Sequence, residues 1–209
     1  MPADTQRSIA IVVLAAGRSS RMGGMKLLLP LGGRPVIAHV AAAALASSLR
    51  PVVVVLGHQA NEVASALPSS GPMVLTNANY QQGQSTSLRA GIAALPPDTT
   101  GAIIMLGDQP LVTAAILERL AAAAATRDAP IIAASYGGQR GNPVYFHRLC
   151  FPELLAVQGD EGGRGVIARH SHDLALVKMQ DTDAALDVDS PDDYARLCAL
   201  WARRHPTPP

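Results

Sequence analysis

Short aliphatic segments alternate with helix-like segments through residue 126, and this alternation limits the fold more than any other feature. The segment VVVVL at 52–56 is nearly pure valine, as expected for a strand covered on both faces. The expected strands are Ile9–Leu14, Val52–Leu56, Met73–Thr76 and Ala102–Leu106. The expected helices are about Pro35–Ser47, Ala60–Leu67, Ser85–Leu95 and Thr113–Thr126, with Ser85 and Thr113 as N-caps. This β-α repeat predicts a parallel sheet with helices on both sides.

The pattern changes after Pro130. Ile131–Ser135 and Val144–Phe146 are expected to be hairpin arms joined by GGQRGN as a loop. The remaining expectations are short helices near Phe151–Val157 and Gly163–Arg169, a strand at Leu174–Met179, and a helix from Pro191 to about Arg203. We see no repeat and no linker-like composition, so we expect one α/β domain over residues 1–209.

Composition excludes several classes of protein. Only 3% of the 209 residues are aromatic, so the core must be aliphatic. The formal net charge is +1, so no overall electrostatic field favours binding of nucleic acid or an anionic membrane. No apolar run approaches the ~20 residues of a membrane span. The start, MPADTQRS, lacks the apolar region of a signal peptide, and the two cysteines form no zinc spacing. We therefore expect a cytoplasmic protein that binds neither nucleic acid nor a membrane.

A cationic, glycine-rich segment follows the first expected strand. LAAGRSSRMGGMK, residues 14–26, holds three glycines, two arginines and a lysine, and no carboxylate. Glycines allow close approach of backbone N–H groups to phosphate oxygens, and Arg and Lys neutralise their charge. The segment predicts a polyphosphate site, and the alternative is an ordinary strand-to-helix connection with solvated basic residues.

Other candidate residues follow the same edge of the expected sheet, where ligands of open α/β sheets bind. The loop that begins NANYQQGQS is rich in amides and hydroxyls that can recognise a base by hydrogen bonding, or that simply cap a helix. Asp108 directly follows the strand AIIMLG, where a carboxylate suits Mg²⁺ in phosphate chemistry. In the late segment DVD, Asp189 is either a second metal ligand or the N-cap of the last helix.

Taken together, these segments carry a family resemblance. LAAGRSSRMGGMKLLLPLGGRPVIAH, LGDQP and DVDSPDD resemble the nucleotidyltransferase superfamily, and GQSTSLRAG with GDEGGRG resembles the molybdenum cofactor cytidylyltransferases. The resemblance covers about Ile9 to Leu197. It implies a three-layer Rossmann-like fold whose mostly parallel sheet has an antiparallel strand and a small substrate-binding subregion. Residues 1–130 would form the nucleotide-binding half and 131–209 the acceptor-binding half.

The resemblance also implies roles for individual residues. Arg21, Lys26 and Asp108 would be catalytic, and Asp108 and Asp189 would hold Mg²⁺, with Mn²⁺ equally suited to oxygen ligands. The nucleotide would be bound by Leu14, Ala15, Ala16, Gly17, Arg18, Ser19, Gly83, Ser85 and Ser87. The acceptor would be bound by Arg140, Gly141, Asn142, Asp160 and Arg164. Related guanylyltransferases carry LAGG where this chain has LAAG, so Ala16 favours CTP. Asn142 stands where the family commonly has His, and Asn does not titrate near neutrality.

The activity implied is transfer of CMP from CTP to the terminal phosphate of a molybdopterin cofactor, with release of pyrophosphate. The partners implied are CTP, the molybdopterin cofactor and, transiently, a molybdenum hydroxylase. Two alternatives remain open at this point. One is a guanylyl- or cytidylyltransferase acting on a sugar or alcohol phosphate. The other is a non-catalytic carrier of the cofactor, although a carrier needs no triphosphate clamp.

Overall fold

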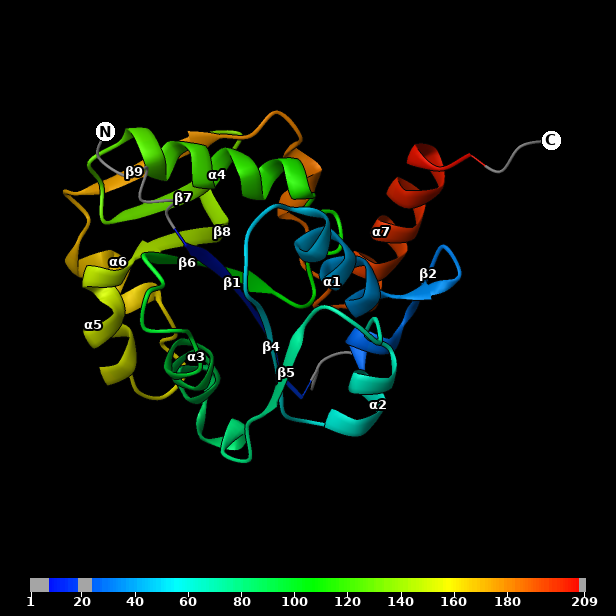
Figure 1. Ribbon diagram of the computed structural model, residues 1–209. Coiled ribbons are helices and arrows are strands. Elements are labelled where there is room, and N and C mark those ends of the chain that lie inside the picture. Colours follow the sequence, from blue (N-terminus) through cyan, green and yellow to red (C-terminus); the bar gives the residue numbers. More distant parts are fainter. Residues whose placement is uncertain (1–7, 19–23, 207–209) are drawn as a thin grey trace.

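Figure 1 shows a computed structural model of the protein, which describes residues 8–18 and 24–206. A seven-stranded sheet runs through it in the order β5-β4-β1-β6-β8-β7-β9. Its strands are β1 Ile9–Ala15, β4 Val52–Leu56, β5 Met73–Thr76, β6 Gly101–Leu106, β7 Ile131–Tyr136, β8 Gln139–His147 and β9 Leu174–Lys178. Neighbouring strands of this sheet are parallel except where β8 pairs with β6 and β7. The expected mostly parallel sheet with an antiparallel strand is confirmed.

Helices cover both faces of the sheet (Figure 1). One face packs against α1 Val36–Ala46, α2 Ala60–Ser65, α4 Ala114–Thr126 and α7 Pro191–Arg204. The other face packs against α3 Gln84–Ala93, α5 Phe151–Ala156 and α6 Arg164–Arg169. Each helix of the described residues is too short or too polar to cross a lipid bilayer.

The valine-rich strand β4 explains why two apolar layers form. Alternate side chains of a strand point to opposite faces of its sheet. Val52 and Val54 therefore join the core beneath α1 and α4, whereas Val53 and Val55 join the core beneath α3, and all four are at most 1% exposed. A strand buried on both faces belongs in the interior of a parallel sheet, where the sequence places it.

The structure corrects two local predictions. The segment GGQRGN is not a loop, because β8 begins at Gln139 and the turn shrinks to Gly137 and Gly138, whose φ angles are 58° and 88°. Two successive residues with positive φ make a two-residue hairpin turn, so both arms continue to it. Ser85 is not an N-cap, because α3 begins one residue earlier and Gly83 holds the cap position.

A small hairpin that the sequence did not predict lies outside the main sheet. Its strands are β2 Pro30–Leu31 and β3 Arg34–Pro35, and it lies beside α7 in Figure 1. The hydroxyl of Tyr194 on α7 donates a hydrogen bond to the Pro30 carbonyl. The hairpin connects the segment after β1 to α1, and so fixes the path of the chain as it leaves the sheet edge.

Candidate functional site

The chemically active side chains gather at the carboxyl ends of the parallel strands. Residues 16–18 follow β1, and Asp108 lies two residues beyond the end of β6. Because β1 and β6 are paired in parallel, with Leu14 opposite Leu106, the two ends lie next to each other. The backbone N–H of Val188 donates to the Asp108 carbonyl at 3.2 Å, which brings the late DVD segment to the same edge.

Lys26 contacts both of the carboxylates, Asp108 and Asp189, that were predicted from the sequence to be metal ligands. Its ammonium donates to Asp108 Oδ2 and, at 2.7 Å, to Asp189 Oδ1. The side chains of Lys26 and Asp108 are 14% and 15% exposed, and that of Asp189 is 52% exposed. Burial alone lowers the pKa of Lys26, but the charge and hydrogen bonds of the two carboxylates outweigh it and raise that pKa. The cationic loop and the acidic strand end therefore meet in one cluster.

Asp189 is available for this cluster because another residue caps the last helix. Ser190 is the N-cap of α7, and its hydroxyl accepts a hydrogen bond from the Asp193 backbone N–H. The Asp193 side chain in turn accepts from the Ser190 backbone N–H, which completes a capping box. The alternative in which Asp189 caps the helix is wrong.

A third carboxylate lies beside this cluster. Burial first, and then the negative charge of Asp108, raises the pKa of Asp187 to about 6. Gln109, which is 3% exposed, donates to Asp187 Oδ1 at 2.5 Å and fixes its orientation. The sequence pointed to Asp187 only as part of the DVD segment, and its contact with Gln109 could not be predicted from spacing.

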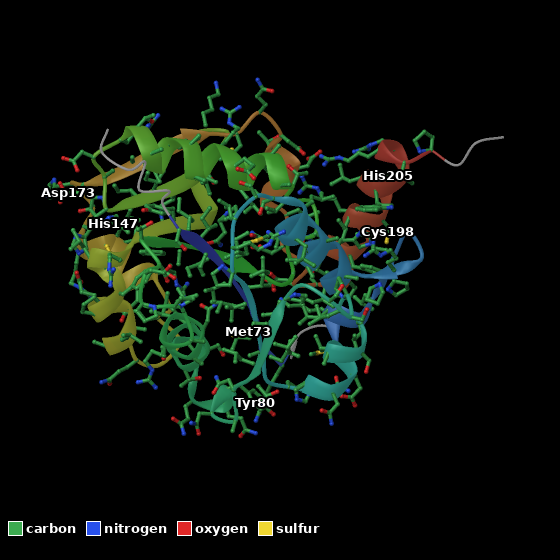
Figure 2. The ribbon with its side chains drawn as sticks, in the orientation of Figure 1. Met73, Tyr80, His147, Asp173, Cys198 and His205 are labelled. Carbon is green, nitrogen blue, oxygen red and sulfur yellow. The ribbon has the colours of Figure 1, made fainter. Side chains whose placement is uncertain are left out.

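A cavity of about 470 Å³, which we call the loop cavity, opens beside Lys26. It is lined by Leu14, Ala15, Ala16, Gly17, Arg18, Lys26, Leu27, Tyr80, Gln81, Gly83, Gln84, Ser87, Leu106, Asp108 and Asp160. Tyr80, labelled in Figure 2, lies on the short turn after β5, and its ring centroid is 5.7 Å from the Arg18 guanidinium carbon. The cavity thus combines backbone from the β1 loop with cations, amides and one aromatic ring.

Seven of the nine residues predicted to bind a nucleotide line the loop cavity, and Ser85 and Ser19 are the other two. Ser85 does not line it: this side chain is 1% exposed, and its hydroxyl has no hydrogen-bond partner among the described residues. Ser19 and Arg21, the latter predicted to be catalytic, lie outside the described residues. Sequence reasoning missed Tyr80, Gln81 and Gln84, although all three belong to the amide-rich loop that it singled out.

Asn77 is a further residue that the sequence did not single out. Its side-chain amide donates to Thr86 Oγ1 at 2.8 Å and to Ser87 Oγ at 3.0 Å, and its carbonyl oxygen accepts from the Asn79 N–H at 2.9 Å. It is 6% exposed and ties the end of β5 to the first turn of α3. The available signal was an Asn directly after the expected strand Met73–Thr76.

We expect Asn77→Ala to destabilise the protein by about 1–3 kcal/mol, because the substitution leaves buried polar partners unsatisfied. Urea unfolding followed by circular dichroism measures the change. Asn61→Ala is the matched control, since Asn61 is exposed on α2. Equal stabilities of the two variants would contradict the proposed bracing role of Asn77.

A second cavity, of about 360 Å³, lies between the β7–β8 hairpin and α6, and we call it the hairpin cavity. It contains Arg140, Gly141, Asn142 and Arg164 of the predicted acceptor residues, together with Asp187 and apolar side chains such as Phe146. Asp160 lines the loop cavity instead, where its carboxylate accepts from the Gln84 N–H at 3.2 Å. Leu14, Gln84 and Leu106 line both cavities, so the two are adjacent.

The donor set at Asp108 and Asp189 fits a divalent cation that is shared with a phosphate ligand. Asp108 Oδ1 is buried and has no hydrogen-bond partner among the described residues. In residues 8–18 and 24–206, no group of three or more His, Cys, Asp or Glu side chains is arranged to hold a metal ion alone. Mg²⁺ commonly binds through one or two carboxylates plus phosphate oxygens and water, which matches this arrangement.

Comparison with known sequences points to one family. The sequence profile of the MobA-like NTP transferase domain matches residues 11–174. Purine catabolism protein PucB of Bacillus subtilis is 32% identical, over 88% of this chain and 92% of PucB. The molybdenum cofactor cytidylyltransferase of Escherichia coli is 26% identical, over 90% of this chain and 94% of that enzyme. The bifunctional protein GlmU of Kineococcus radiotolerans is 41% identical over 54% of this chain, but the match spans 24% of GlmU.

Solved structures agree in fold over nearly the whole chain. Rv0371c from Mycobacterium tuberculosis H37Rv has a TM-score of 0.82 and 33% identity, with 92% of this chain and 98% of that chain covered. The same protein in complex with manganese has a TM-score of 0.79, 31% identity and the same coverage. A nucleotidyl transferase from Methanothermobacter thermautotroptrophicus, Mth528, has a TM-score of 0.82 and 26% identity, with 95% of this chain and 99% of that chain covered.

Proposed function

We propose that this chain, which belongs to the MobA-like NTP transferase domain family, transfers CMP from CTP to the terminal phosphate of a molybdopterin-type cofactor and releases pyrophosphate. The observation that carries the proposal is the meeting of the Lys26 ammonium with the Asp108 and Asp189 carboxylates beside the loop cavity, which Lys26 and Asp108 line. Such a cluster suits a metal–triphosphate complex, because it supplies both metal ligands and a cation for phosphate oxygens.

The loop cavity is proposed as the nucleotide site. Backbone of residues 14–17 would lie beneath the nucleotide, and Arg18 and Lys26 would contact the triphosphate together with Ser19 and Arg21. Gly83 and Ser87 would lie near the cytosine and ribose. Ala16 favours CTP through the resemblance to cytidylyltransferases, and the amide-rich lining contributed by Gln81 and Gln84 supports recognition of a base by neutral hydrogen bonds.

The hairpin cavity is proposed as the acceptor site. Its two guanidinium groups, Arg140 and Arg164, suit a phosphorylated acceptor, and its apolar lining side chains suit a ring system. Because the two cavities share lining residues, the phosphate of an acceptor in the hairpin cavity would lie near the α-phosphorus of a nucleotide in the loop cavity. The full-length similarity to the Escherichia coli cytidylyltransferase supports a molybdopterin as that acceptor.

The proposed reaction is an in-line substitution at phosphorus. An oxygen of the acceptor phosphate forms a bond to the α-phosphorus of CTP, and the bond from that phosphorus to the bridging oxygen of pyrophosphate breaks. The nucleophile is already an anion, so the protein contributes alignment and charge neutralisation. Lys26 stabilises the negative charge that gathers on the leaving pyrophosphate. Asp108 and Asp189 would hold a divalent cation, which would supply further charge stabilisation, and the manganese-bound Rv0371c structure supports such an ion.

The test is pyrophosphate release from each of the four NTPs in the presence of Mg²⁺ and molybdenum-loaded molybdopterin. We expect release with CTP, at a rate well above that with GTP, ATP or UTP, and none without the acceptor. Mass spectrometry of the product should show the cofactor enlarged by one CMP unit.

Other outcomes of the same assay identify the alternatives. Preference for GTP would overturn the assignment of CTP. Turnover with sugar phosphates but not with molybdopterin would favour the alternative acceptor class. Tight pterin binding without pyrophosphate release would indicate a cofactor carrier.

A further inference from the structure

We propose that Lys26 is an exchangeable counter-ion: its ammonium holds the cation position between Asp108 and Asp189 until a metal–nucleotide complex takes over the carboxylates and draws Lys26 onto the triphosphate. This inference rests on the proposed nucleotidyl transfer. It predicts that the divalent ion and the nucleotide bind interdependently, through one side chain of this protein.

The contacts of Lys26 carry the first step. The ammonium bonds Asp108 Oδ2 and Asp189 Oδ1, which belong to the same two carboxylates proposed to hold the divalent cation. A divalent ion bound to the same two carboxylates would lie next to the ammonium and repel it strongly. Metal binding by both carboxylates therefore favours departure of the ammonium.

The second step concerns where the ammonium can go. Lys26 also lines the loop cavity, so its side chain already borders the proposed triphosphate site. Its backbone is held in the short turn Lys26–Leu28, and the next residue, Leu27, is 3% exposed in the core. A lysine side chain has a flexible four-carbon stem, so the ammonium can move while the backbone stays in place. Phosphate oxygens then replace the carboxylates as its partners.

The third step is the energetic consequence. Without a nucleotide, a divalent ion must displace the ammonium into water, and this cost weakens the binding of the divalent ion. With a nucleotide, the displaced ammonium gains phosphate partners, so the same ion binds more tightly. Coupling of this kind is reciprocal, so the ion must improve nucleotide binding by the same factor. Lys26 thereby limits tight metal binding to the complex that contains the triphosphate.

The experiment measures Mn²⁺ affinity directly, by electron paramagnetic resonance of free Mn²⁺, with and without CTP and without any acceptor. We compare the unmodified protein with Lys26→Met and, as a control, Lys178→Met; Lys178 is the one other lysine of the sequence and is exposed on β9. We expect Lys26→Met to bind Mn²⁺ alone roughly tenfold more tightly, because the competing cation is gone. The same variant should show little or no further gain when CTP is added.

Two results would overturn the inference: unchanged or weaker binding of Mn²⁺ alone by Lys26→Met, or equal coupling to CTP in the variant and the unmodified protein. Lys178→Met should match the unmodified protein in both titrations. Lys26→Gln provides a second variant, and circular dichroism checks that both variants fold. The titration without nucleotide does not depend on the identity of the NTP or acceptor. If the pyrophosphate assay selects another NTP, the proposed function fails while the Mn²⁺ titration still tests Lys26.

Discussion

Asp108→Asn is expected to lower kcat/KM for nucleotidyl transfer by about 10²-fold or more, because it removes a negative charge that the proposed metal–triphosphate complex requires. Asn has nearly the same shape, so the packing of the β6 end is kept. The backbone carbonyl of residue 108 still accepts from the Val188 N–H, which holds the DVD segment at the sheet edge. The loss should therefore appear in catalysis and Mn²⁺ affinity rather than in folding.

The measurement is steady-state pyrophosphate release, with the melting temperature recorded in parallel. Asp173→Asn is the matched control, since Asp173 is exposed before β9 and lies away from the site (Figure 2). The control should keep the activity of the unmodified protein. Near-normal turnover by a folded Asp108→Asn variant would remove Asp108 from the proposed mechanism.

The sheet and the meeting of Lys26 with Asp108 were predictable from sequence for one physical reason. A strand with an aliphatic run such as VVVVL is apolar on both faces, so it must be buried between two layers of helices. Parallel strands bring their carboxyl ends to one edge of the sheet. The predicted bounds of β4 and β5 are confirmed at both ends. Once β1 and β6 are neighbours, the residues that directly follow them lie close together, whatever their separation along the chain.

Several features of the candidate site depend on tertiary contacts that the sequence does not reveal. Ser85 looked like a cap because Ser favours that position, but Gly83 takes it and Ser85 is buried. The hydrogen bond between Gln109 and Asp187 joins residues 78 positions apart, and no local pattern encodes it. Tyr80 reaches the loop cavity because the chain turns after β5, which composition alone does not specify. Local chemistry thus identified the loops, and packing selected the side chains within them.

Gly83 shows how such packing constrains the site. Its φ of 108° and ψ of 165° are essentially restricted to glycine, and a Cβ atom there would lie 2.3 Å from the Gly159 carbonyl oxygen. That same oxygen accepts the Ser85 N–H at 3.0 Å, and the adjacent Asp160 carboxylate accepts the Gln84 N–H at 3.2 Å. The start of α3 and the 159–160 segment therefore fit together only when residue 83 has no side chain.

Gly83→Ala is accordingly expected to lower the stability by about 1–3 kcal/mol from backbone strain, and the contact with the Gly159 carbonyl oxygen adds to this loss. It should also lower kcat/KM by about 10²-fold, because it displaces the lining of the proposed nucleotide site. Gly33→Ala isolates the backbone component, since Gly33 has a φ of 80° with open space around it. If Gly83→Ala lost no more activity than Gly33→Ala, the close fit between the start of α3 and residues 159–160 would not control nucleotide binding.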